Sequence, residues 1–249
     1  MIWNRKQVED FAKTVLAPLE KDEVYLMLLA ARKKYWPELP RSEEVLKREI
    51  VRRNDPLYFY QKVVRLFPQP TAYIEYNTGK PIPLEAMVIY VVVNPKSCVK
   101  AFTKFKKEVD DWMYELAVSE KPDFERFRRL DLKLFSAIHR STSRHLYWLV
   151  DMDKHDIDLL KSVARRIGDE NIVWVSATRG GFHLIVRKTE ETGKLLFTEI
   201  AEIPDVEVKK EAMTPVPGTE QGGYSVWGAP SAEAVVCEYM WKYMLRVRK

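Results

Sequence analysis

The chain has 249 residues, of which 46% are apolar and 31% charged, and this balance excludes an intrinsically disordered protein. Its formal net charge of +5 is compatible with a polyanionic partner but does not by itself indicate one. Two cysteines, Cys98 and Cys237, are too few for a disulfide framework or a four-cysteine zinc site, and no apolar run approaches the roughly 18 residues of a membrane span, so we expect a cytoplasmic protein with no membrane partner.

The first 70 residues are expected to be mainly helical. The spacing of apolar residues predicts a short amphipathic helix over 8–16 and a longer one over 22–35, which stops before a proline. Ser42, followed by two glutamates, is the expected start of a third helix. A fourth helix is expected over 56–66.

The middle of the chain, residues 71–145, is expected to form an αβ unit. An alternating segment at 71–76 and a continuous β-branched run at 86–93 predict two strands, the second covered on both faces. Helices are expected over 97–116 and 124–138.

Residues 146–249 carry the most regular pattern of the chain. Strands are expected at 146–153, 172–177, 182–186 and 205–209, and helices at 157–167 and 190–200. This is the β-α-β-β-α-β order of ferredoxin-like and RNA-recognition-motif (RRM) folds. A C-terminal helix is expected from Ser231 to Arg246.

We therefore predict an α/β (α+β) fold with an RRM-like core, a helical N-terminal part and a small additional β unit. No linker is long enough to separate independent domains, so residues 1–249 are expected to form one domain. Glutamine and asparagine are scarce, and this usage favours a thermophilic source.

Two carboxylates follow the apolar residues of the expected strand at 146–153. Asp151 and Asp153 are two residues apart, so their side chains project from the same face of that strand. Neighbouring carboxylates repel each other, and a hard divalent ion such as Mg²⁺ or Mn²⁺ compensates their charge through oxygen ligands. The alternative is structural, with Asp153 capping the next helix and Asp151 solvated at the strand end.

A second group of candidate residues surrounds the expected β-hairpin. Gly180 and Gly181 suit a tight turn and allow a ligand to approach the backbone closely. Arg179 precedes them, and His183 follows on the strand face opposite its apolar neighbours. The alternative is a structural histidine and a solvated arginine.

A third candidate, Glu207, lies between two valines of the last expected strand, so its side chain points to the face opposite theirs. It is either a solvent-facing strand residue or a third acid of the same site.

These features, in this order, resemble the three motifs of the archaeo-eukaryotic primase superfamily, most closely its small primase-polymerase branch. The matching residues are Asp151 and Asp153, then Gly181-Phe182-His183, then Val206-Glu207. The resemblance covers residues 146–223. Gly181 stands where the family has a serine, and two isolated cysteines cannot form the zinc module that many relatives carry.

The resemblance implies a DNA-dependent nucleotidyltransferase, a primase or primase-polymerase, that adds nucleotides to a primer on a single-stranded DNA template by two-metal-ion catalysis with Mg²⁺ or Mn²⁺. The catalytic and metal-binding residues would be Asp151, Asp153 and Glu207. The nucleotide-binding residues would be His183, Arg179, Gly181 and Lys209. The substrate would be a dNTP or NTP, and a helicase or other replication protein is a further expected partner.

Basic residues mixed with aromatic ones precede the first motif, a combination that suits a single-stranded template. They are Arg126, Arg128, Arg129, Lys133, Arg140 and Arg144. A solvated helix face is the alternative.

Other functions remain open on this sequence. A non-catalytic or inactive nucleic-acid-binding replication subunit would bind the template without adding nucleotides. A metal-dependent nuclease on the same sheet topology is another alternative, although the rolling-circle type carries His-x-His, and Leu184-Ile185 follow His183 here. A nucleotidyl cyclase would carry a different acidic signature on the hairpin.

Overall fold

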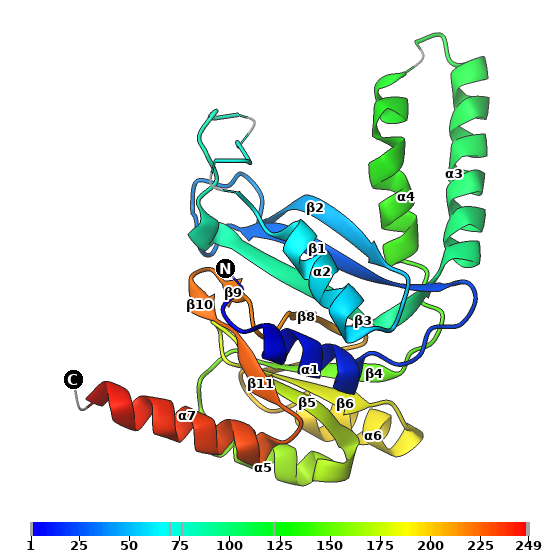
Figure 1. Cartoon of the computed structure of the whole chain (residues 1–249). Helices are drawn as coiled ribbons and strands as arrows, with labels where there is room; N and C mark the ends of the chain where they lie inside the picture. Colours follow the sequence, from blue (N-terminus) through cyan, green and yellow to red (C-terminus); the bar gives the residue numbers. More distant parts are fainter. Residues whose placement is uncertain (1, 70, 76, 122, 248–249) are drawn as a thin grey trace.

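The computed structural model describes the backbone of residues 2–247, apart from 70, 76 and 122, and the side chains of these residues up to 241. The chain forms α-helices and antiparallel sheets, so the predicted mixed α/β class is confirmed. Two main sheets have the strand orders β2-β1-β3-β8 and β11-β5-β6-β4-β7, and β9 and β10 form a separate two-stranded ribbon (Figure 1). No helix in this described part is long and apolar enough to cross a membrane.

The four-stranded sheet is built mostly from the first hundred residues. Its strands are β1 (Glu23–Arg32), β2 (Glu43–Val51), β3 (Met87–Ser97) and β8 (Met213–Pro215), and all neighbours are antiparallel. Helices α1 (Arg5–Val15) and α2 (Pro56–Leu66) contribute to the core on one face of this sheet, and a short 3₁₀ helix (Leu84–Ala86) leads into β3. The strand expected at 86–93 and the helices expected at 8–16 and 56–66 are therefore confirmed.

Three predictions for the first half of the chain are wrong. The helices expected over 22–35 and after Ser42 are strands β1 and β2, because β1 is buried on both faces and its continuous apolar run has no strand-like alternation. The expected strand at 71–76 makes only an isolated bridge between Ile74 and Pro81, and residue 76 lies outside the described residues. The part of the chain before residue 70 is thus mixed rather than helical.

The five-stranded sheet contains the four strands expected in the second half of the chain, together with a fifth, β11. Its strands are β4 (Tyr147–Met152), β5 (Ile172–Ala177), β6 (Phe182–Arg187), β7 (Val206–Lys209) and β11 (Trp227–Ala229). The helices are α5 (Ile157–Ile167), a 3₁₀ turn (Asp169–Asn171), α6 (Glu190–Leu195) with a π-helical continuation (Leu196–Ile200), and α7 (Ala232–Val247). The predicted antiparallel hairpin of β5 and β6 is confirmed, with Ser176 opposite His183.

The two sheets share one apolar core. One face of the five-stranded sheet packs with α5, α6 and α7, whereas part of the other face packs with α1 and the four-stranded sheet. Phe11 of α1 contacts Trp174 of β5 and Phe59 of α2, with ring centroids 5.4 and 6.4 Å apart. Helix α1 therefore lies between the sheets, as Figure 1 shows. Beside it, β9 (Glu220–Gln221) and β10 (Tyr224–Ser225) form the ribbon.

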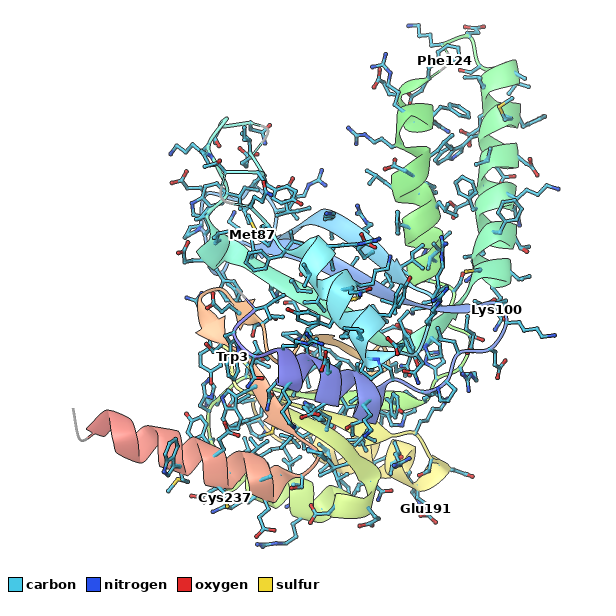
Figure 2. The ribbon with its side chains drawn as sticks, viewed as in Figure 1. Trp3, Met87, Lys100, Phe124, Glu191 and Cys237 are labelled. Carbon is cyan, nitrogen blue, oxygen red and sulfur yellow. The ribbon has the colours of Figure 1, made fainter. Side chains whose placement is uncertain are left out.

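A helical hairpin projects from the edge of the four-stranded sheet (Figure 1). It consists of α3 (Cys98–Val118), a 3₁₀ helix (Glu125–Arg129) and α4 (Leu130–His139). The helices expected at 97–116 and 124–138 are confirmed, although the second begins with 3₁₀ geometry. Figure 2 shows Lys100 at the base of the hairpin and Phe124 at its tip, so most of its length extends beyond the body of the molecule.

Candidate active site

Strand pairing brings the predicted acids and the histidine together. On β4, Asp151 is directly opposite His183 of β6 on one side and Glu207 of β7 on the other. Residues directly opposite each other in antiparallel strands have their side chains on the same face of the sheet. The sheet therefore carries Asp151 at the centre of a row of three candidate residues.

Asp151 accepts hydrogen bonds from two side chains on this face. Its Oδ1 is 2.9 Å from Nε2 of His183, and its Oδ2 is 2.6 Å from Nζ of Lys209. The same Lys209 ammonium is 2.9 Å from Oε2 of Glu207. Lys209 therefore bridges the two carboxylates that the sequence predicted as metal ligands.

The surroundings strongly favour the charged forms of Asp151 and Lys209. Burial opposes the ionisation of Asp151, whose side chain is 15% exposed, but the charge and hydrogen bond of His183 and the hydrogen bond from Lys209 outweigh it and hold the pKa of Asp151 well below its usual range. Burial likewise acts against the Lys209 ammonium, but hydrogen bonds to Asp151 and Glu207 raise the pKa of Lys209. The two groups form a persistent ion pair across neutral pH.

His183 has both ring nitrogens occupied. Its Nε2 faces Asp151, and its Nδ1 is 3.0 Å from the hydroxyl of Thr214 on β8. The side chain is nearly buried between the two sheets. His183 is thus positioned to orient the Asp151 carboxylate, whereas the sequence predicted a direct contact with nucleotide.

A cleft of about 200 Å³ opens above these residues, between the two sheets. Basic and aromatic groups from the first sheet and its flanking loop line one side, and acids, His183 and Lys209 from the second sheet and its following segments line the other. The lining residues used below are Arg32, Lys34, Tyr90, His139, Asp151, Asp153, His183, Lys209 and Glu211. Glu207 lies at the edge, with a side chain that is 63% exposed, and joins the group through Lys209.

Arg32 and Lys34 are candidate functional residues that the sequence reasoning missed. The Arg32 guanidinium lies 2.8 Å from the hydroxyl of Tyr90 and 3.0 Å from a carboxylate oxygen of Glu43. Burial, and then the nearby Arg32, lower the pKa of Lys34. Both cations lie at the end of the apolar run of β1. An apolar strand that ends in Arg-Lys-Lys is a signal for such a site, but the helix predicted over 22–35 hid it.

Asp153 and Lys34 approach each other around the β5–β6 turn. A Cβ placed on Gly180 would lie 3.9 Å from Oδ1 of Asp153 and 3.8 Å from Nζ of Lys34. Both side chains are therefore within a few ångströms of the same glycine. Asp151 and Asp153, which were expected to lie close together, both line the cleft.

A buried lysine supports the far end of the cleft. Lys96, which is fully buried, donates to Glu211 at 2.6 Å and to the hydroxyl of Thr142 at 2.7 Å. Burial lowers the pKa of Lys96, while the bond to Glu211 acts in the opposite direction. The pair fixes Glu211 in the cleft wall next to His139.

Two predicted nucleotide contacts have other partners. The Arg179 guanidinium donates to the carbonyl of Gly222 and lies 4.3 Å from the centre of the Tyr35 ring. The Gly181 N–H lies 3.3 Å from the hydroxyl of Thr178. A Cβ on Gly181 would be 2.0 Å from the carbonyl oxygen of Met152, so glycine is required here by the close approach of the β4 backbone.

The predicted template-binding residues lie away from the cleft. On the hairpin, Arg126 pairs with Glu115, Arg128 with Glu125, and both Lys133 and Arg140 with Glu108. Arg129 is on the same hairpin, and Arg144 pairs with the buried Glu23. None of the six, all within the described residues, lines the cleft.

The donor set was tested against the implied divalent cation. Within residues 2–247, leaving out 70, 76 and 122, no three His, Cys, Asp or Glu side chains are grouped so as to hold a metal ion. The carboxylates of Asp151, Asp153 and Glu207 are nevertheless the hard oxygen donors that Mg²⁺ and Mn²⁺ prefer. These donors fit such a cation in kind, and Lys209 already supplies one positive charge between two of them.

Comparisons with protein-family models, with curated proteins and with solved structures found no match. The chemistry of the cleft is therefore the basis for inferring function.

Proposed function

We propose that the protein is a nucleotidyltransferase of the primase or primase-polymerase type, which adds nucleotides from dNTP or NTP to a primer on a single-stranded template. The observation that carries the proposal is the row His183, Asp151 and Glu207 on three neighbouring strands, beside a cleft that Asp151, Asp153 and His183 line together with cations. The resemblance to primase motifs implies this combination.

The strand order supports an RRM-like core. Without β11, the five-stranded sheet has the order β7-β4-β6-β5, and every neighbouring pair is antiparallel. Helix α5 connects β4 to β5, and α6 connects β6 to β7. This connectivity favours a split β-α-β unit, in which the first and third strands lie side by side at the centre. Asp151 and Glu207 lie on the first and fourth of these strands, and Asp153 directly follows the first.

The chain's own residues have distinct parts in this proposal. Asp151, Asp153 and Glu207 would hold the divalent cations, which when bound supply charge neutralisation and activation of the attacking hydroxyl. His183, backed by Thr214, keeps Asp151 in one orientation.

Binding of the triphosphate is assigned to Arg32 and Lys34, which line the wall opposite the acids. Charge-assisted hydrogen bonds from guanidinium and ammonium groups are the strong contacts to phosphate oxygens. This assignment replaces the one made from the sequence for Arg179, which is not among the residues that line the cleft.

Primer extension with a labelled primer–template, dNTPs and Mn²⁺ tests the proposal. The unmodified protein should extend the primer, and Asp151→Asn and Asp153→Asn should each reduce the rate by about 10³-fold or more, because each removes one anionic metal ligand. Glu202→Gln, which changes an exposed acid outside the cleft, is the matched control and should keep the full rate. Extension by Asp151→Asn at the normal rate would overturn the proposal.

A non-catalytic nucleic-acid-binding subunit is the second candidate, and the double ion pair of Lys209 favours it. A lysine that already bridges Asp151 and Glu207 neutralises acids that a catalytic site would keep for cations. In this case the unmodified protein would retard single-stranded DNA in a gel but leave the primer length unchanged. Shortening of the primer in the same assay would instead indicate a nuclease.

A further inference from the structure

Asp153 lies just beyond the strand that carries Asp151, so the sheet alone does not fix its position. Strand β4 ends at Met152, and the chain bends at Asp153. The side chain of Asp153 is exposed, and it makes no hydrogen bond or ion pair within the part of the chain that the structure describes. Contacts to the backbone of this bend must therefore hold Asp153 in the cleft.

Two bonds from Asp205 hold the bend on one side. The Asp153 N–H donates to the carbonyl oxygen of Asp205 at 3.0 Å, and the Lys154 ammonium lies 2.5 Å from Oδ2 of Asp205. The first bond uses the backbone of Asp205, and the second uses its carboxylate. Together they attach Asp153 and the residue after it to the segment that leads into β7.

Gly181 closes the other side of the same bend. A Cβ on Gly181 would lie 2.0 Å from the carbonyl oxygen of Met152, and 2.6 and 2.7 Å from the backbone nitrogen and oxygen of Lys154. The backbone that leads into β6 therefore packs directly on the residues before and after Asp153. The bend is held from both strands that flank β4.

The backbone of Asp205 has an uncommon conformation. Its φ is 63°, in the left-handed region, and Thr71 is the other non-glycine residue with a positive φ among those described. Pro204 comes directly before Asp205, and the Val206 N–H bonds across the turn to the carbonyl oxygen of Ile203 at 3.2 Å. Proline second and a positive φ third are features of a type II β-turn, whose third residue is usually glycine or asparagine.

An aspartate at the third position of this turn has a reason in its contacts. Glycine would adopt a positive φ without strain, but it has no carboxylate to bind Lys154. A side chain in a sparsely populated backbone region persists where the surrounding structure holds it, and such residues gather at functional sites. Asp205 is two residues before Glu207, at the edge of the cleft.

We propose that Asp205 is a positioning residue, which holds Asp153 where it acts with Asp151 and Glu207 on a divalent cation; this role rests on the function proposed above. Asp205 acts on Asp153 through the hydrogen bond between their backbones, and on Glu207 through the chain that connects them. One turn therefore sets the relative position of two of the three acids, on opposite sides of the gap between β4 and β7.

Hydrogen exchange, measured for each residue by NMR, tests the backbone contact in the protein without metal. The Asp153 amide should be protected in the unmodified protein. Asp205→Val should speed its exchange by about tenfold or more, because a β-branched residue disfavours a positive φ. Asp205→Asn should keep the protection, since asparagine adopts this conformation and offers an oxygen to Lys154. The amides within β4 should exchange as before, which separates a local effect from loss of the sheet.

Isothermal titration with MnCl₂ tests whether the position of Asp153 matters for the cation. Asp205→Val should weaken Mn²⁺ binding by about tenfold, as expected for a residue that supports a metal ligand, and Asp205→Asn should stay within about twofold of the unmodified protein. Asp205→Ala should shift exchange and affinity in the same direction by less, and it replaces the valine variant if that variant does not fold.

Asp10→Ala is the matched control for both measurements. It removes a carboxylate of similar exposure that pairs with Lys6, also at 2.5 Å, but on α1 and away from the cleft. Unchanged exchange at Asp153 in Asp205→Val, or faster exchange with unchanged Mn²⁺ affinity, would overturn the positioning role. If the unmodified protein binds no Mn²⁺, the function proposed above fails instead, and faster exchange at Asp153 in Asp205→Val would still support the positioning role.

Discussion

The cleft and the helical hairpin use charged residues in opposite ways. Around the cleft, the pairs Lys209–Asp151 and Lys96–Glu211 each join distant parts of the chain and have a well-buried member. On the hairpin, the Arg128–Glu125 pair joins residues close in sequence, and both of its side chains are exposed. The first kind places charged groups where little water reaches them, whereas the second kind lies in solvent at the protein surface.

This difference indicates where chemistry is located. An ion pair loses hydration when it is buried, and this cost is offset only by good geometry and further hydrogen bonds. Asp151 has such geometry, with partners on both oxygens. Exposed pairs such as Arg128–Glu125 contribute little to stability.

The largest effect is expected from the backbone contact that closes the cleft at the β5–β6 turn. Gly181→Ala should lower the free energy of unfolding by roughly 3 kcal/mol or more, because the new Cβ would lie 2.0 Å from the carbonyl oxygen of Met152 and the strands would have to separate. Urea denaturation at pH 7 measures this. Gly193→Ala in α6 is the control, since its nearest neighbours are 3.8 Å away and alanine favours helix. A Gly181→Ala protein as stable as Gly193→Ala would show that the backbones around Gly181 and Met152 can move apart at little cost.

The next effect concerns the buried carboxylate of Glu23. Hydrogen bonds from Arg144 lower the pKa of Glu23 from 4.5 to about 2. Because the pKa is lower in the folded state, the pair stabilises the fold above pH 4.5, and this contribution is lost as the pH falls toward 2. Allowing for water around the partly exposed Arg144, Glu23→Gln should cost about 2 kcal/mol at pH 7 and little near pH 2. Urea denaturation of both proteins across this range checks it, and an equal cost at both pH values would contradict it.

A smaller effect is expected at Lys209, where the cleft already contains a cation. Lys209→Met removes the ammonium from between Asp151 and Glu207, and the affinity for Mn²⁺ should then rise about tenfold, or about 1.4 kcal/mol. Isothermal titration with MnCl₂ measures this without any activity assay. Lys210→Met, the neighbouring lysine over the Phe197 ring, is the control. Weaker Mn²⁺ binding by Lys209→Met would mean that the lysine supports the acids rather than competing for them.

The smallest effect is expected on the hairpin. Arg128→Ala breaks an ion pair whose two side chains are 78% and 70% exposed, and the free energy of unfolding should change by less than about 0.5 kcal/mol. Thermal unfolding at low and at high salt checks this. A loss above about 1 kcal/mol would show that hairpin charges stabilise the fold as the cleft charges do.

Local signals explain why the second half of the fold was predictable. Helix α5 begins where the side chain of Asp156 accepts from the backbone of Asp158 and Leu159, a cap that can be read from the sequence. The tight β5–β6 connection is likewise marked by its two glycines. Strand β1 has no such signal, because burial on both faces leaves a uniform apolar run that also suits a helix.

The site was predictable to the extent that it depends on strand alternation. Alternation and the hairpin placed Asp151 and His183 on facing positions, and Glu207 came to the same row through β7. The bridge formed by Lys209 and the position of Lys34 depend on how distant elements meet. No local sequence pattern encodes how distant elements meet, so the prediction for phosphate binding fell on Arg179 rather than Lys34.

The position of α1 between the two sheets has a consequence for how the chain acquires its structure during synthesis. The first residues pair with some of the last: the Trp3 N–H donates to the carbonyl of Gly218, and the Gln7 side chain bonds to the backbone of Gly228. Phe11 likewise packs against Trp174, which is synthesised much later. Since a ribosome releases the chain from its N-terminus, α1 emerges before these partners and cannot dock fully until more than 200 further residues have followed. The part of its apolar face that packs on Trp174 therefore stays uncovered until β5 has been synthesised.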